Sequence, residues 1–170
     1  MLAYSAYGFE YDCSPKTGFV KLNEAVVWQG SWCGSFTNHR GVNVLLVDPF
    51  NCLVLESRRF DTYASGARAT ELSSYLRSLN YGSVVVAVTA DEPHRHLSNA
   101  LPTLRQVGVE LADVRFRGSF AFIIQKGYPN KTALSKALTE AESHASPARL
   151  DAVITGMQTL QSDVITLCSV

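Results

Sequence analysis

One segment near the middle of the chain constrains the fold more than any other. From Val84 to Thr89 every residue is β-branched or apolar, and no polar residue interrupts the run. A strand with one face in water usually alternates apolar and polar residues, whereas a strand without that alternation is buried on both faces. The segment Ser83–Thr89 therefore predicts a strand that is covered on both faces.

The segment from Arg40 to Ser65 predicts a β-hairpin that leads into a helix. Val42, Val44 and Leu46 alternate with Asn43, Leu45 and Val47. Residues 48–51 then read Asp-Pro-Phe-Asn, and residues 53–55 resume the apolar run. Asp, Pro and Asn are typical turn residues, so the turn is expected at residues 48–51. The hairpin then ends at Phe60-Asp61-Thr62-Tyr63, where a helical pattern takes over.

Apolar spacing and breaker residues predict the other elements. Together they indicate one α+β domain over residues 1–170, without internal repeats or an obvious linker. The expected elements are an opening hairpin at 8–29 with a turn at Ser14–Gly18 and a strand at Val26–Trp28, helices at 66–79, 98–107 and 133–143, a strand at 116–126, a short helix around 150–157, and a last strand at 164–167.

Composition excludes several classes of protein. The chain has 170 residues, is 46% apolar, and carries fifteen basic against fifteen acidic residues. Such a chain can bury a sizeable core and is too apolar for disorder. Because the net charge is zero and no basic run occurs, we expect no nucleic-acid partner. Its apolar runs are far shorter than the roughly 20 residues of a membrane span, so no membrane insertion is expected.

Cysteine usage bears on the cellular compartment. Cys13, Cys33, Cys52 and Cys168 form no Cys-x-x-Cys pair. An even number of widely spaced cysteines suits two disulfides in a secreted protein, with three connectivities open; buried free thiols are the alternative. Asn130 begins an Asn-Lys-Thr glycosylation sequon, which fits secretion. The first twelve residues lack the basic start and long apolar stretch of a signal peptide, and a mature secreted chain would look the same.

Five short motifs follow one another along the middle of the chain. They are Arg40–Val44, Phe60–Tyr63, Ala87–Glu92, Phe116–Phe122 and Gln125–Gly127. In this order they resemble the interleukin-like EMT inducer domain, also called the ILEI/FAM3 or GG domain, and are closest in kind to the lectin-like stem domain of protein O-mannose N-acetylglucosaminyltransferase. The family-like core covers residues 40–127, which leaves an opening hairpin at 8–29 and an extra helical C-terminal segment at 133–170.

The resemblance implies a fold and a function. The fold is a compact α+β domain with two small, mainly antiparallel β-sheets flanked by short helices and no catalytic role of its own. In the glycosyltransferase stem the domain binds sugar, and the polar residues of that site fall on the motif positions of Arg40, Asp91 and Arg117. The resemblance therefore implies a lectin-like carbohydrate-binding protein, with glycans or glycoproteins as partners.

The chemistry of these three residues agrees with sugar binding. A sugar hydroxyl both donates and accepts hydrogen bonds, arginine offers a rigid fork of donors, and an ionised aspartate only accepts. A few such bonds, each contributing about 1.5–3 kcal/mol, give millimolar to high-micromolar affinity for a monosaccharide after the cost of association. Useful binding would then need multivalency, which favours a homodimer or clustered glycans. An Arg–Asp network that only braces loops is the structural alternative.

One motif departs from the family pattern. The family usually reads Arg-Asp-Ser/Thr-Trp where this chain has Arg117-Gly118-Ser119-Phe120. Phe120 keeps an apolar ring in place of the indole and is a candidate site residue. The differences from the family pattern leave the identity of the sugar open. Trp32, in the Gly- and Ser-rich loop ahead of Arg40, is a second candidate for stacking on a sugar, with loop packing as its alternative.

Other functions remain open. A secreted, cytokine-like signalling or adhesion protein of the FAM3 type, with a protein receptor, is the main alternative, and an accessory module of a glycan-processing enzyme is a third. Cys33 with His39 or His96 matches no hydrolase signature, and a disulfide is the favoured role for this cysteine. His94 and His96 beside Asp91 form an unreliable metal pattern because Pro93 disturbs the strand. We therefore expect no enzyme activity, no metal and no cofactor.

Overall fold

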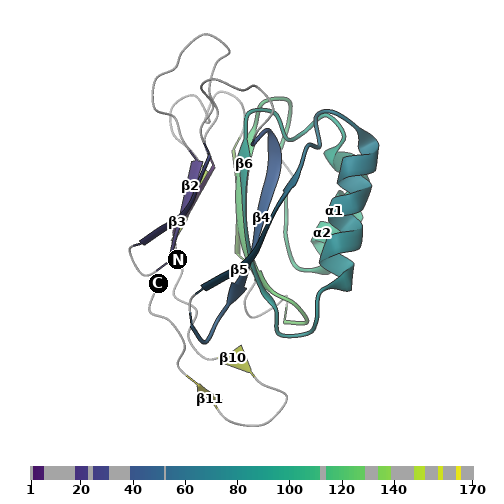
Figure 1. Ribbon diagram of the computed structural model, residues 1–170. Coiled ribbons are helices and arrows are strands. Elements are labelled where there is room, and N and C mark those ends of the chain that lie inside the picture. Colours follow the sequence, from purple (N-terminus) through teal and green to yellow (C-terminus); the bar gives the residue numbers. More distant parts are fainter. Residues whose placement is uncertain are drawn as a thin grey trace.

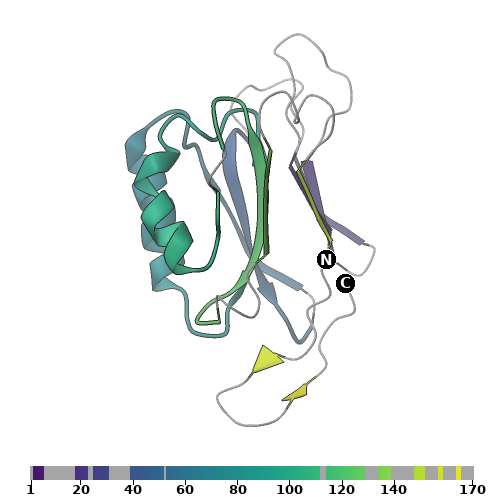
Figure 2. The same cartoon turned by 180° about the vertical axis from the view of Figure 1, so that it is seen from behind.

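The chain forms a three-layered α+β fold (Figures 1 and 2). The computed structural model describes residues 2–5, 18–22, 25–30, 39–51, 53–111, 114–128, 134–138, 148–151, 157–158 and 164–165. Helices cover one face of a five-stranded sheet, and a four-stranded sheet lies across its other face. The predicted compact α+β class with antiparallel sheets and short helices is confirmed.

The central layer is a five-stranded antiparallel sheet. Its strands are β4 (Gly41–Asp48), β5 (Leu53–Phe60), β6 (Val84–Ala90), β7 (Ser119–Gln125) and β8 (Leu134–Leu138), in the spatial order β5-β4-β6-β7-β8. Strand β6 is the middle strand and is buried from its first residue to Thr89. The prediction of a strand covered on both faces is confirmed.

Side chains of the central strands alternate between two cores, as the pleat of a β-strand requires. In β7, Phe120, Phe122 and Ile124 point to the helices, whereas Ala121 and Ile123 point to the outer sheet. Burial of one large apolar side chain contributes about 1.5–3 kcal/mol, so both faces of the sheet stabilise the domain. The same alternation places Val42, Val44, Val85 and Ala87 on the helix side and Leu45, Val47, Val84, Val86 and Val88 on the other side.

The outer sheet pairs the first strand of the chain with a strand from its C-terminal part. It consists of β1 (Leu2–Ser5), β2 (Gly18–Leu22), β3 (Ala25–Gly30) and β9 (Ala148–Asp151), in the order β3-β2-β1-β9. Its β2 strand contributes buried side chains to the core between the sheets. A separate two-stranded pair joins β10 (Met157–Gln158) and β11 (Val164–Ile165).

The helical layer contains α1 (Gly66–Ser78), the 3₁₀ turn η1 (Leu97–Asn99) and α2 (Leu101–Gln106). The helix predicted at residues 66–79 is confirmed by α1. The single helix predicted at 98–107 is instead divided into η1 and α2. Pro102 is the physical reason, because proline lacks an amide hydrogen and fits only the first turn of a helix.

The predicted hairpins correspond to observed strands. In the β4–β5 hairpin, the Asp48 carboxylate accepts hydrogen bonds from the backbone amides of Phe50 at 2.8 Å and Asn51 at 3.3 Å. The turn prediction is therefore confirmed. In the opening hairpin, β2 and β3 include the strands expected around residues 19–22 and 26–28. The part of this hairpin before its turn, from residue 8, and residues 14–17 of the turn lie outside the described residues.

The C-terminal prediction is wrong where it expected helices. Residues 134–138 form β8, which pairs with β7 and places Ala137 opposite Phe120. Residues 148–151 form β9, which pairs with β1. Intrinsic helix propensity is a weak preference, and it is overridden where a sheet edge offers hydrogen-bond partners. The predicted last strand at 164–167 is described at Val164–Ile165.

Within the described ranges, no helix has the length and apolar character needed to cross a membrane.

Candidate binding site at one end of the central sheet

The antiparallel order of the sheet gathers four chain segments at one end. Strand β4 begins and β5 ends there, and β6 ends where β7 begins. Arg40 precedes β4, Asp61 follows β5, Asp91 follows β6, and Arg117 stands shortly before β7. The three residues predicted to bind sugar, Arg40, Asp91 and Arg117, are thus carried to the same end of the sheet.

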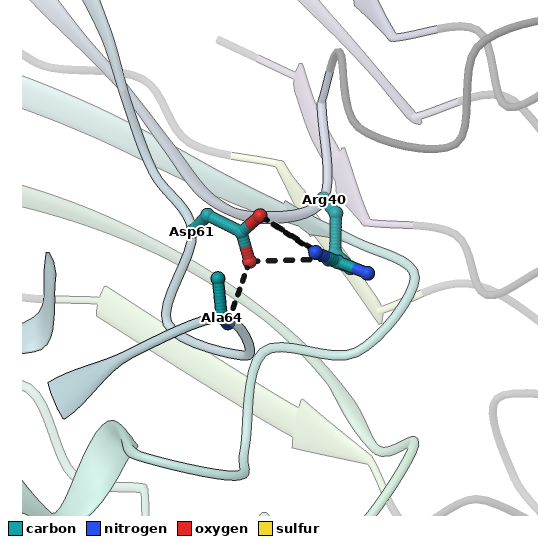
Figure 3. A network of polar contacts seen from close by, with 3 residues as sticks. All are labelled: Arg40, Asp61 and Ala64. Carbon is teal, nitrogen blue, oxygen red and sulfur yellow. Dashed lines mark hydrogen bonds and ion pairs between the residues drawn. The ribbon is translucent and has the colours of Figure 1, made fainter.

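Arg40 is bound to an aspartate that the sequence interpretation did not single out. Its Nε lies 3.1 and 3.2 Å from the two carboxylate oxygens of Asp61, and a terminal guanidinium nitrogen lies 2.9 Å from Oδ2. Asp61 also accepts a hydrogen bond from the backbone amide of Ala64 at 3.0 Å (Figure 3). The hydrogen bonds to Asp61 raise the pKa of Arg40. Arg40 is therefore held in one orientation.

Gly41 allows this close approach of Arg40 to Asp61. The φ angle of Gly41 is +97°, and a Cβ atom added there would lie 2.3 Å from the carbonyl oxygen of Phe60. Only glycine combines such a backbone angle with so little space. The glycine in the Arg-Gly motif thus brings the start of β4 against the end of β5.

Asp91 and Arg117 both have left-handed backbone conformations. Their φ angles are 55° and 56°, and they are the positive-φ residues other than glycine in the described part of the chain. This conformation is tolerated by aspartate but is an outlier for a bulky residue such as arginine. Residues held in this way cost about 1–3 kcal/mol each and are concentrated at functional sites.

Glu92 fixes the backbone of both loops. Its side chain is buried, and its Oε1 accepts a hydrogen bond from the backbone amide of His94 at 2.6 Å. The other oxygen accepts a hydrogen bond from the backbone amide of Arg117. One carboxylate therefore joins the segment after β6 to the segment before β7, and it positions Arg117 without contacting a ligand itself.

The Asp91 carboxyl group lies in a half-buried, strongly charged environment. Burial raises its pKa to about 6, the negative charges of Glu92 and Asp61 add to that rise, and Arg40 and Arg117 oppose it. Asp91 is thus within electrostatic range of both arginines. The structure brings the predicted trio together, although Arg40 donates its hydrogen bonds to Asp61.

Two threonines brace the loops. The Thr89 hydroxyl lies 3.0 Å from the amide nitrogen and 3.1 Å from the carbonyl oxygen of Phe120, where the β6–β7 ladder ends. The Thr62 hydroxyl donates to the carbonyl of Pro93 at 2.6 Å, and the Thr62 carbonyl accepts from the amide of His96 at 3.0 Å. These bonds hold the loops together and favour a preformed site.

Aromatic rings at this end lie beside arginine side chains. The Cζ atoms of Arg40 and Arg95 are 4.6 and 5.1 Å from the centre of the Tyr63 ring. The Cζ atom of Arg117 is 5.2 Å from the ring centre of Phe116, which is 53% exposed. Sequence reasoning missed Tyr63 and Arg95 as site residues, although Tyr63 belongs to a quoted motif.

Some predicted site residues do not join this group. Phe120 is a correction: its side chain is 0% exposed and packs in the core beneath the helices, so it cannot contact a ligand. Trp32 lies outside the described residues. The disulfide candidates Cys13, Cys33, Cys52 and Cys168 and the sequon residue Asn130 also lie outside them and stay predictions.

Among the described residues, no three His, Cys, Asp or Glu side chains are grouped so that they could hold a metal ion. His94 and His96, the histidines considered for a metal, use their backbone amides to bind Glu92 and Thr62.

Comparison with known proteins identifies the family. The sequence profile described as Interleukin-like EMT inducer matches residues 40–128, which is 89 of the 170 residues. This chain belongs to that family. The match includes the strands β4 to β7 and every residue of the candidate site, from Arg40 to Arg117.

Curated relatives share the same region. The chain is 32% identical to the human cell migration-inducing and hyaluronan-binding protein over 96 residues, which is 55% of this chain and 7% of that protein. It is 29% identical to mouse protein FAM3A over 105 residues, covering 61% of this chain and 45% of the relative. Human protein FAM3A is 30% identical over 95 residues, covering 55% and 40%. The chain therefore matches less than half the length of each of these relatives.

Proposed function

We propose that this chain is a secreted, cytokine-like recognition protein of the FAM3 type that binds a protein receptor and has no catalytic role. Membership of the interleukin-like EMT inducer family and the similarity to FAM3A support this proposal. The matched region contains the whole candidate site, so the surface at this end of the sheet is the part of the chain that we expect to bind the receptor.

The observation that carries the proposal is the set of arginine and aromatic side chains at this surface. Phe116 is 53% exposed with the Arg117 guanidinium over its ring, and Arg95 lies over Tyr63. Aromatic and arginine residues are the types most enriched at the centres of protein interfaces. The braced loops would present these side chains with little ordering cost.

Binding of the fluorescently labelled chain to receptor-bearing cells tests this surface. We expect Phe116→Ser to weaken saturable binding at least about tenfold, as removal of an interface anchor does. Tyr81→Ser is the matched control, because Tyr81 is 76% exposed and lies before the start of β6, at the opposite end of the sheet. Equal binding by wild type and Phe116→Ser would remove this surface from the proposal.

Secretion is tested separately by mapping the cysteines. The proposal expects Cys13, Cys33, Cys52 and Cys168 to form two disulfides in protein purified from the culture medium of expressing cells. Peptide mass spectrometry without reduction would identify the pairs. Four free thiols in the native protein would contradict an oxidising compartment.

Carbohydrate binding is the second candidate function, and the environment of Asp91 favours it. A carboxylate within electrostatic range of two arginines offers an acceptor beside donors, as a sugar hydroxyl needs. The name of the human relative also describes that protein as hyaluronan-binding. The candidate ligand residues are Arg40, Asp91 and Arg117.

A glycan array with monosaccharide competition tests this candidate. Binding to a glycan that both Asp91→Ala and Arg117→Ala abolish would support a lectin-like site. Glycan binding that neither change affects would place the sugar elsewhere, and no binding to any glycan would favour the protein receptor.

A further inference from the structure

Arg95 is an exposed arginine whose side chain is already ordered by a neighbouring ring. It stands in the loop between β6 and η1, and its Cζ lies 5.1 Å from the centre of the Tyr63 ring. Tyr63 is in turn contacted by Arg40, which the bonds to Asp61 hold in place. A guanidinium that rests on a fixed ring loses less freedom on binding than an arginine that extends into water.

The backbone on both sides of Arg95 is also fixed. Pro93 accepts the hydrogen bond from the Thr62 hydroxyl, and His96 donates its amide hydrogen to the Thr62 carbonyl at 3.0 Å. The amide of Leu97 donates to the carbonyl of His94 at 2.9 Å, which closes a turn around Arg95. The loop therefore presents Arg95 from a defined position.

Arg95 differs from neighbouring Arg40 in its electrostatic partners. In the described part of the chain, ion pairs join Arg40 to Asp61, Arg58 to Glu56 and Arg68 to Glu71. Among these same residues, Arg95 contacts the Tyr63 ring and has no carboxylate within ion-pair distance. A guanidinium fork matches a carboxylate in a bidentate geometry. Arg95 thus offers unused donors in an ordered position.

The charges around Arg95 favour a single carboxylate over a polyanion. Three carboxylates at this end of the sheet, those of Asp61, Asp91 and Glu92, oppose the arginines. Because these three carboxylates offset most of the charge of the arginines at this end (Arg40, Arg95, Arg115 and Arg117), the surface has no broad positive field to attract a chain of repeated anions. A protein segment that combines one acidic side chain with apolar residues fits better, since the exposed Phe116 lies at the same end of the sheet.

We propose that Arg95, lying on Tyr63, is a subsite for the side-chain carboxylate of an acidic segment in the protein partner. This rests on the proposed function and names the chemistry of the receptor at that surface. The carboxylate accepts two hydrogen bonds from the Arg95 fork, and Tyr63 maintains the orientation of the guanidinium.

A fluorescent ten-residue peptide with one central glutamate flanked by leucine and serine residues is the probe for this subsite. Fluorescence anisotropy should show salt-sensitive binding to the wild-type chain and at least tenfold weaker binding of the same peptide with glutamine in place of glutamate. Arg95→Gln should weaken binding of the acidic peptide about tenfold. Arg105→Gln, an equal change of charge at an exposed position in α2, should leave it unchanged.

A second variant separates geometry from charge. Arg95→Lys keeps the positive charge but loses the planar fork, so we expect a loss of about threefold or more. Binding by Arg95→Lys equal to wild type, or equal losses in Arg95→Gln and Arg105→Gln, would overturn the subsite. Arg95-dependent binding of a hyaluronan oligosaccharide in place of the peptide would assign the anion to a glycan and also overturn the proposal.

The receptor assay distinguishes this proposal from the proposed function. Cell binding that is saturable in the wild type and unchanged in Arg95→Gln would overturn the subsite and leave the receptor function standing. A wild-type chain without saturable binding to any cell type that responds to it would contradict the receptor function itself.

Discussion

Both ends of the β6–β7 strand pair contain residues with positive φ angles, but the residue types differ between the two ends. At the end away from the candidate site, Gly82 and Gly127 flank the strands with φ angles of 85° and 89°. At the site end, the positive-φ positions are Asp91 and Arg117, at 55° and 56°. Glycine adopts this conformation without strain, whereas arginine does not. The positive-φ positions at the site end therefore carry charged side chains, as the proposed binding role requires.

Hydrogen bonds hold the two ends in different ways. At the glycine end, backbone groups bond directly, with Gly82 donating to the Lys126 carbonyl at 2.9 Å and Lys126 donating to the Ser83 carbonyl at 2.8 Å. At the site end, the side chains of Thr89 and Glu92 replace such backbone pairs. The loops at the site end are therefore joined through side chains, whereas the turn at the glycine end is closed by backbone bonds.

The largest effect is expected when the brace at the site end is removed. Glu92→Ala leaves two backbone amides, those of His94 and Arg117, without their carboxylate acceptor. Loss of a buried charged acceptor costs about 3 kcal/mol. Urea unfolding monitored by circular dichroism should show this decrease, while Glu110→Ala, at an exposed position, should change stability by less than about 0.5 kcal/mol.

Alanine at the glycine end gives the next largest effect. Gly127→Ala should destabilise the fold by about 2 kcal/mol, because its φ is +89° and an added Cβ would lie 2.3 Å from the Tyr81 ring. Gly82→Ala meets no atom within 4 Å and should cost only about 1 kcal/mol for its backbone angle. Thermal unfolding of both variants measures the difference. A smaller cost for Gly127→Ala than for Gly82→Ala would contradict this account of the turn.

The ionisation of Asp91 should make stability depend on pH. Its pKa of about 6 in the folded chain exceeds its ordinary 3.8, so the folded state binds this proton more tightly than the unfolded state. The ionised carboxylate therefore destabilises the fold at neutral pH, and this cost disappears as the pH falls from about 6 to about 4. Asparagine tolerates the same φ angle as aspartate. The free energy of unfolding of Asp91→Asn should therefore exceed that of the wild type by about 1 kcal/mol at pH 7.5, a value reduced because the group is partly exposed. At pH 4 the two should be equally stable.

Denaturant unfolding at both pH values tests the role of Asp91. Glu110→Gln, at an exposed position, serves as a control for the removal of one carboxylate. An Asp91→Asn gain that is as large at pH 4 as at pH 7.5 would mean that relief of charge burial is not its cause.

Part of the fold could be predicted from the sequence because local patterns decide it. The uninterrupted apolar run at Val84–Thr89, the hairpin turn at Asp48–Asn51 and the apolar spacing of α1 are each set by neighbouring residues. Strand β8 could not be predicted in this way, because its residues favour a helix and only the free edge of β7 makes them a strand. Patterns in a single sequence do not show which strands that are distant in the chain pair with each other.

The candidate site, too, could be predicted from the sequence only in part. Arg40, Asp91 and Arg117 were found through a family resemblance, and the sheet brings them to one end. Asp61 was missed as the partner of Arg40, since 21 residues separate the two in sequence. Glu92 was missed as a brace for the same reason, because 25 residues separate it from Arg117. Phe120 was wrongly included because motif position alone does not reveal which face of a strand is buried.

The central claim, that Arg117 is strained because its side chain is needed, is tested most directly by Arg117→Gly with stability and binding measured together. Glycine relieves the left-handed backbone, so the free energy of unfolding should rise by about 1 kcal/mol. Binding to receptor-bearing cells, or to a glycan if one is found, should fall at least about tenfold. A variant that is more stable and binds as well as wild type would contradict the claim, because the side chain would then have no role that explains the strain.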